Sequence, residues 1–128
     1  IGCVNVKRND KKRSRYALKQ AINEEAKSQS GQLVIYPEGT RTMPGQEVEY
    51  KKGVLLLFSR LNRPLYLVST NAGLAWSKTG KFKENSNASI NFLEKINFVK
   101  REDHNLSYIK DKIEKDSQKL YNEEVTRG

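Results

Sequence analysis

Hydrophobic and polar positions follow two different periods along the chain, and these periods predict its elements. Short apolar runs next to turn residues predict strands at residues 33–36 and 64–69, and a loose alternation with Val4 and Val6 on one face predicts a strand at 2–8. Alternation of apolar and polar residues predicts a further strand over 88–96, at a sheet edge.

Helical spacing accounts for most of the remaining apolar positions. A helix is predicted over 14–27, with Ser14 as its N-cap. Residues 54–61 are apolar on nearly every face, which predicts a short buried helix. Asn105 is the predicted cap of a last helix that ends at about Val125. The expected buried stripe of that helix consists of Leu106, Ile109, Ile113, Leu120 and Tyr121.

The order of the first elements predicts the fold class. A strand, a helix and a strand within the first 36 residues form a βαβ unit, which implies parallel strands and a right-handed crossover. The expected fold is therefore α/β, a mainly parallel sheet with helices on both faces. The 128 residues fit a single domain with one modest core.

Composition narrows the classes of partner. The net charge of +9 favours an anionic partner: nucleic acid, anionic lipid headgroups or a phosphorylated substrate. The longest apolar run, 54–58, is too short to span a bilayer.

The single cysteine, Cys3, excludes an internal disulfide and a multi-cysteine metal site, and we expect no metal and no cofactor.

Candidate chemistry gathers directly after the strand predicted at 33–36. There Glu38, Thr40 and Arg41 surround Gly39. Ligands of open α/β sheets bind beyond the carboxyl ends of strands, a glycine lets the backbone approach a ligand closely, and a guanidinium suits phosphate. The alternative is a Pro-Gly turn that carries solvated charges.

The segment Pro-Glu-Gly-Thr-Arg at 37–41 resembles the Phe-Pro-Glu-Gly-Thr-Arg signature of the glycerolipid acyltransferases. The chain is most similar to the bacterial 1-acylglycerol-3-phosphate (lysophosphatidic acid) acyltransferases. Asn71, Gly73 and Trp76 match an Asn-Ser-Gly-x-x-Trp stretch of that group. The resemblance implies the glycerol-3-phosphate acyltransferase-like fold, incomplete here, with 1–128 as one partial acyltransferase domain.

Two weaker matches add candidate basic residues. Residues 2–8 resemble the motif Gly-x-Ile-Phe-Ile-Asp-Arg, which places Arg8 near the acceptor phosphate, although Asn5 and Lys7 depart from the pattern. Tyr-Lys-x-Gly at 50–53 resembles Phe-Lys-x-Gly, which implies that Lys51 faces the phosphate pocket. For both residues the alternative is a solvated charge.

The resemblance implies a reaction and a role for each residue. A fatty acyl group passes from acyl-CoA or acyl-carrier protein to the sn-2 hydroxyl of lysophosphatidic acid, giving phosphatidic acid in phospholipid biosynthesis. Arg41 is expected to bind the phosphate through paired charge-assisted hydrogen bonds. Glu38 accepts from a glycerol hydroxyl or holds Arg41, Gly39 permits the turn, and Thr40 donates a hydrogen bond.

The same resemblance implies a location at the cytoplasmic face of the cell membrane, on an anionic membrane surface. Trp76 is then expected to touch the acyl chain or the membrane interface, and its alternative is an ordinary core tryptophan. The loop 77–87 carries Lys78, Lys81 and Lys83, which either meet anionic lipid or are simply solvated.

The catalytic pair that the family implies, His-x-x-x-x-Asp, is missing from this sequence. The sole histidine is His104, and Ile109 stands five positions later. We therefore expect the pair upstream of Ile1, and an acceptor-binding half that does not turn over alone.

Two alternative functions remain open. One is acyl transfer to another acceptor, glycerol-3-phosphate or a different lysolipid. The other is a basic nucleic-acid-binding module. We predict no nucleic-acid partner, because the sequence shows neither an aromatic-basic RNA-recognition strand nor a helix with its basic residues on one face.

Overall fold

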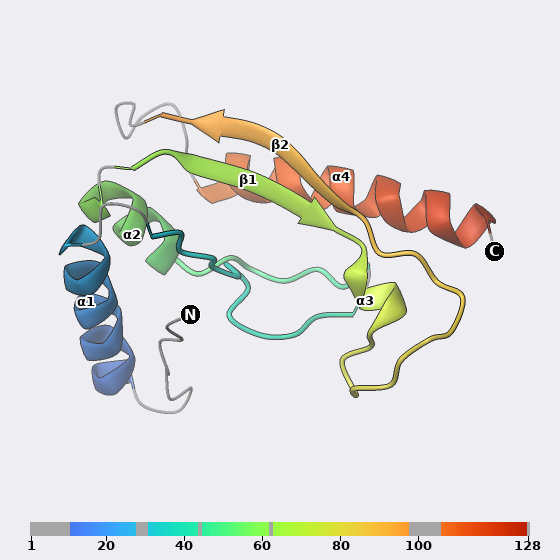
Figure 1. Cartoon of the computed structure of the whole chain (residues 1–128), viewed down its shortest axis with the longest axis horizontal. Coiled ribbons are helices and arrows are strands. Elements are labelled where there is room, and N and C mark those ends of the chain that lie inside the picture. Colours follow the sequence, from blue (N-terminus) through green and yellow to red (C-terminus); the bar gives the residue numbers. More distant parts are fainter. Residues whose placement is uncertain (1–10, 28–30, 44, 62, 98–105, 128) are drawn as a thin grey trace.

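The computed structural model describes residues 11–27, 31–43, 45–61, 63–97 and 106–127. The elements run in the order α1 (Lys11–Lys27), α2 (Gly53–Leu61), β1 (Leu65–Thr70), α3 (Ala72–Ala75), β2 (Ile90–Ile96) and α4 (Leu106–Arg127) (Figure 1). The predicted helices after residues 14, 54 and 105 are all present.

Helix α1 begins at Lys11, three positions before the predicted N-cap Ser14, so that capping prediction is wrong. Lysine and arginine are strong helix formers, and the basic residues before Ser14 therefore extend the helix toward the N-terminus. α1 packs beside α2 at one end of the molecule (Figure 1).

The described part of the chain holds one sheet, made of β1 and β2. The two strands are antiparallel, from Leu65 opposite Ile96 to Thr70 opposite Ile90, with an irregularity between Leu67 and Val68. Both predicted strands are therefore confirmed as strands, at slightly shifted bounds.

The parallel sheet stays a prediction. Its expected first strand, 2–8, lies outside the described residues, as does the predicted N-cap Asn105. The strand predicted at 33–36 is wrong: residues 31–36 belong to no strand ladder among the described residues, and Val34 and Tyr36 are exposed. A strand needs a neighbouring backbone to complete its hydrogen bonds, and none of the described segments supplies that neighbour.

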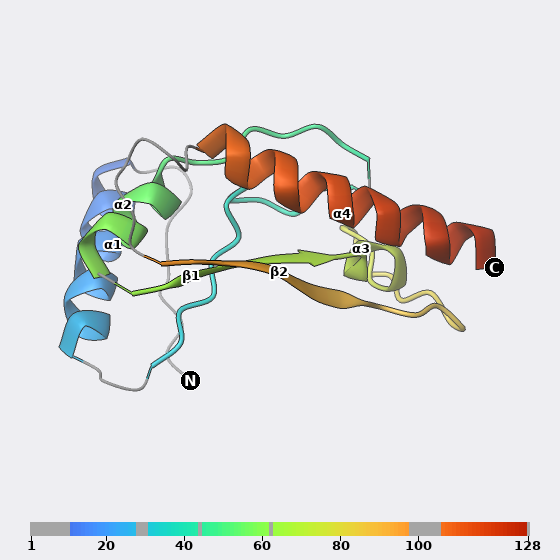
Figure 2. The ribbon, with the colours of Figure 1, turned by 90° about the horizontal axis from the view of Figure 1, so that it is seen from above.

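Helix α4 lies across one face of the sheet (Figure 2). The core between them is built around Tyr50, Leu67, Ile96 and Ile109. Ile109 and Leu120 of the predicted stripe are buried, which confirms the face that α4 turns toward the sheet.

Polar contacts fix α4 to the sheet as well. Ser69, which is fully buried, donates to Asp116 over 2.6 Å, and the Asn91 amide donates to the same carboxylate oxygen over 3.0 Å. Further along α4, the backbone N–H of Asn87 donates to Glu124 over 2.8 Å. These bonds are directional, so they set the rotation and the register of α4.

Candidate functional site

The chain turns sharply where the sequence predicts a turn, directly after Tyr36. The backbone N–H of Gly39 donates to the Tyr36 carbonyl over 3.0 Å. Gly39 has a φ of +64°, in the left-handed region that side chains with a Cβ rarely adopt. Glycine at this position therefore allows the turn.

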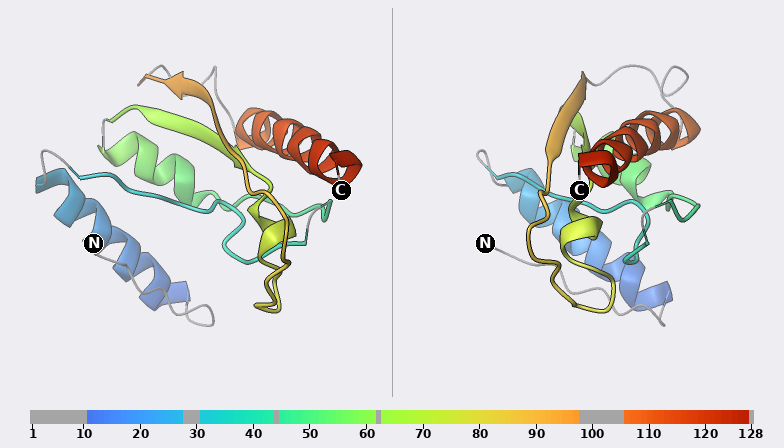
Figure 3. Two further views of the ribbon diagram at one scale, coloured as in Figure 1. Left: turned by 45° about the vertical axis from the view of Figure 1, so that its right-hand side comes forward. Right: turned by 90° about the vertical axis from the view of Figure 1, so that its right-hand side faces the viewer.

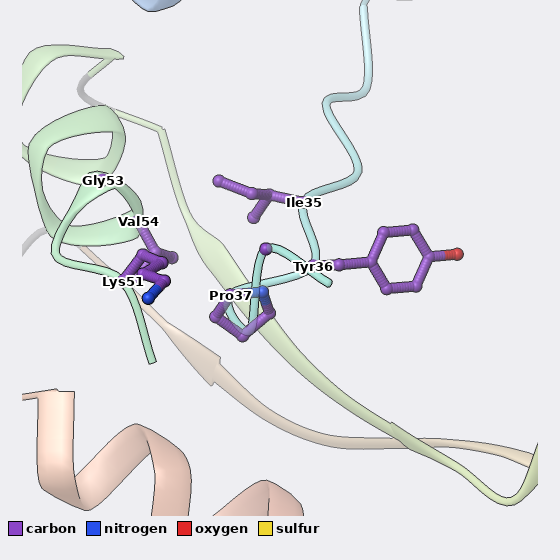
Figure 4. Close-up of a pocket in the computed structure, with 7 residues that line it drawn as sticks. Ile35, Tyr36, Pro37, Lys51, Gly53 and Val54 are labelled. Atoms are coloured by element: carbon purple, nitrogen blue, oxygen red, sulfur yellow. The ribbon is translucent and has the colours of Figure 1, made fainter. Parts of the chain in front are cut away.

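A second segment closes against this turn. The backbone N–H of Lys51 donates to the Pro37 carbonyl over 2.7 Å, which holds the start of α2 beside the signature segment. A hollow of about 250 Å³ lies between the two segments. Figure 4 shows Ile35, Pro37 and Lys51 around this hollow, while the Tyr36 ring points away. Its lining residues are Ile35, Tyr36, Pro37, Gly39, Lys51, Gly53 and Val54.

The structure brings some of the predicted site residues together. Gly39 and Lys51 both line the hollow, and a Cβ added to Gly39 would lie 3.4 Å from Lys51 Cγ. Thr40 and Arg41 are exposed beside the hollow and do not line it. Arg41 forms no ion pair with any residue that the structure describes. Arg8 lies outside the described residues.

Glu38 lies within the turn, is half-buried and does not line the hollow. Its Oε2 atom is buried and has no hydrogen-bond partner among the described residues, so it does not hold Arg41 here. Burial raises the pKa of the Glu38 carboxyl, its own backbone N–H opposes that shift, and the charge of Glu114 adds to it. The environment therefore makes ionisation of Glu38 harder than that of an exposed glutamate.

Tyr50 and Glu114 complete the surroundings of Glu38, and neither was predicted as a functional group. Tyr50 is buried, and its hydroxyl donates to Glu114 Oε1 over 2.8 Å. Burial raises the pKa of Tyr50 strongly, and the hydrogen bond to Glu114 and the two nearby carboxylates raise it further. The aromatic residue before Lys51 was readable from the sequence, whereas its partner 64 positions later carries no local signal.

Asn71 and Trp76, which match the second stretch of the family, lie at the far end of β1. Asn71 is buried and structural: its side-chain oxygen accepts from Ser89 N–H over 2.7 Å, and its amide donates to the Leu120 carbonyl over 3.2 Å. Trp76 is 63% exposed, so its interpretation as a core tryptophan is wrong. α3 ends at Ala75, and the extended backbone of Trp76 carries the side chain out of the core.

Comparison with known proteins identifies the family. The protein-family model described as Acyltransferase matches residues 1–71, more than half of the chain and the whole signature segment. The chain belongs to the Acyltransferase family. A general acyl-transfer function follows, within the glycerolipid acyltransferases that the signature resembles. Neither the search of curated proteins nor the search of solved structures found a match.

None of the helices in the described part of this acyltransferase is long and apolar enough to cross a membrane. Among the same residues, which do not include Cys3 and His104, no group of three or more side chains could hold a metal ion.

Proposed function

We propose that this acyltransferase acts on lysophosphatidic acid. In this proposal the sn-2 hydroxyl receives a fatty acyl group from acyl-CoA or acyl-carrier protein, and the product is phosphatidic acid. The support is the resemblance at Pro37–Arg41 together with the family match that includes it.

The observation that carries the proposal is the hollow beside the signature turn. Lys51 lines it, Gly39 leaves it open, and the exposed Arg41 adjoins it. An ammonium and a guanidinium are the groups that bind a phosphate by charge-assisted hydrogen bonds. A glycerophosphate headgroup fits this chemistry, with Arg41 turning toward the phosphate when it binds.

Glu38 suits the same ligand in a different way. A carboxylate next to a bound phosphate would repel it, but burial shifts Glu38 toward its neutral form. Glu38 does not line the hollow, and its side-chain oxygen without a hydrogen-bond partner is buried, so in this proposal the side chain turns toward the acceptor before it accepts a hydrogen bond from a glycerol hydroxyl. Glu38 is thus proposed to position the acceptor rather than to bind its phosphate.

The proton-abstracting histidine of the family is not among these 128 residues, because the sole histidine has no aspartate five positions after it. This chain is therefore proposed to supply the binding of the acceptor and not the general base. We place the acyltransferase at the cytoplasmic face of the membrane, where a lysolipid acceptor resides. Glycerol-3-phosphate or another lysolipid shares the headgroup and remains the alternative acceptor.

Titration with sn-glycerol 3-phosphate, followed by NMR of the backbone amides, tests the site without the complication of micelles. We expect the amides of Gly39 and Lys51 to shift, and Arg41→Ala and Lys51→Ala to weaken binding by roughly tenfold or more. Lys81→Ala removes an equal charge from a distant loop and serves as the control. Equal weakening by all three substitutions, with similar binding of any polyanion, would contradict the proposal.

A further inference from the structure

A short hairpin, residues 75–83, follows α3 and presents two aromatic side chains. The backbone N–H of Lys83 donates to the Ala75 carbonyl over 2.8 Å, and that of Ser77 donates to the Lys81 carbonyl over 3.0 Å. These two bonds flank the antiparallel bridge between Trp76 and Phe82. Trp76 and Phe82 are therefore a non-hydrogen-bonded pair, the kind in which the two side chains lie closest and share one face. We call residues 75–83 the aromatic hairpin.

The turn of the aromatic hairpin is held by its own hydrogen bonds. The N–H of Gly80 donates to the Ser77 carbonyl over 2.9 Å, and the N–H of Lys81 donates to Ser77 Oγ over 3.2 Å. Gly80 has a φ of +82°, which a residue without a Cβ adopts freely. The aromatic pair is thus presented by a preformed turn, and little ordering is needed for it to bind a partner.

Both rings are left to solvent. Trp76 is 63% exposed and Phe82 is 72% exposed. The backbone of the aromatic hairpin projects away from α4 (Figure 3). Two large apolar side chains side by side on a projecting turn are typical of an interaction surface.

Positive charge surrounds the rings. Lys78, Lys81 and Lys83 are all exposed, and Glu84 is the first acidic residue after them. Lys81 and Lys83 flank Phe82, and neighbouring residues of a strand point to opposite faces. Their four-carbon stems nevertheless let the ammonium groups reach the level of the rings. The aromatic hairpin is therefore an apolar tip with a cationic border.

We propose that the aromatic hairpin docks on an anionic lipid bilayer, with Trp76 and Phe82 in the interfacial layer and the three lysines on lipid phosphates. Tryptophan is enriched at that interface, and basic residues near an anionic surface add to the attraction. A projecting turn suits a flat surface, whereas single-stranded nucleic acid is held along a basic groove. This surface is separate from the hollow at Gly39 and Lys51, and its role does not depend on which acceptor is used.

The test uses a property of the chain itself, because Trp76 is its only tryptophan. Its fluorescence therefore reports on the aromatic hairpin alone. We expect a shift of the emission to shorter wavelength with phosphatidylglycerol-containing vesicles, loss of that shift at high salt, and almost none with pure phosphatidylcholine vesicles. Unchanged emission at saturating anionic vesicles would overturn the proposal. So would a shift with a single-stranded oligonucleotide and none with the vesicles.

Variants that keep Trp76 separate the contributions of charge and ring. Replacing Lys78, Lys81 and Lys83 by Gln should weaken vesicle binding on the order of a hundredfold, at roughly fivefold for each lysine. The same change of Lys19, Lys115 and Lys119, exposed elsewhere, should have only a small effect. Phe82→Ala should reduce both affinity and spectral shift, and Phe92→Ala, an exposed ring on the sheet, should not. The proposal would be overturned if the two lysine triples weakened vesicle binding equally, or if Phe82→Ala and Phe92→Ala did so.

Discussion

Tyr50 donates a hydrogen bond to Glu114 over 2.8 Å and so joins the segment after the signature turn to the middle of α4. The phenol ring is part of the core, while the carboxylate belongs to an exposed residue. Because Tyr50 directly precedes Lys51, which lines the hollow, the bond links the edge of the hollow to the helix that covers the sheet.

Removing either partner should destabilise the protein by different amounts. Tyr50→Phe leaves Glu114 free to be hydrated, so we expect a loss of about 1 kcal/mol in the free energy of unfolding. Glu114→Ala leaves the buried Tyr50 hydroxyl without its acceptor, and we expect a larger loss of about 1–3 kcal/mol. Urea denaturation of both variants and of the double variant measures the coupling. Strictly additive losses would show that the bond contributes nothing.

Glu38 should make stability depend on pH. Its pKa is raised above the ordinary value of 4.5, so the folded state holds this proton more tightly than the unfolded state does. That stabilisation is complete below pH 4.5 and is lost as pH rises through the higher pKa of the folded state. Glu38→Gln has no carboxyl to ionise, and its advantage over the wild type should grow as the pH rises from about 4.5 through the higher pKa of the folded state.

Urea unfolding midpoints of both proteins over this pH range give the comparison. Glu84→Gln, which removes a negative charge from an exposed loop, controls for the change in net charge. Parallel curves for the wild type and Glu38→Gln would show that burial does not hold the proton on Glu38. Glu114 and Tyr50 face Glu38, so the Glu114→Ala variant should narrow the pH window.

The two turn glycines at Gly39 and Gly80 form a matched pair for substitution. Both have positive φ, and alanine at either should lower stability by about 1–2 kcal/mol through backbone strain. A methyl group on Gly39 would contact Lys51 Cγ at 3.4 Å inside the hollow, whereas one on Gly80 meets no atom within 4 Å. Only Gly39→Ala should therefore weaken binding of glycerol 3-phosphate. Equal affinities of the two variants would place the ligand elsewhere.

The sequence predicted the elements better than their pairing. The period of α4 identifies Ile109 and Leu120 as buried, because a helix imposes its spacing on local sequence. No local pattern indicates that β1 pairs with β2, which begins 20 residues after β1 ends. One signal was available and not used: Asp116 lies on the apolar stripe of α4, and a carboxylate at such a position requires a buried donor, here Ser69.

The candidate site was also predicted only in part, because its local segments are readable from the sequence and its long-range contacts are not. Gly39 and Lys51 lie on segments that a backbone hydrogen bond joins, and the motif resemblance indicated both. Tyr50 and Glu114 were missed, because their contact depends on how α4 crosses the sheet. Trp76 was ambiguous, since an indole suits a core and a surface equally well, and its exposure depends on the end of α3 at Ala75.

The polar bonds of α4 also limit how the length of this helix can change. One residue inserted between Glu114 and Asp116 would rotate every later residue by about 100° around the helix axis. Three hydrogen bonds would then be lost together: Ser69 to Asp116, Asn71 to the Leu120 carbonyl, and Asn87 to Glu124. Insertions are therefore far better tolerated at the tip of the aromatic hairpin than anywhere along the second half of α4.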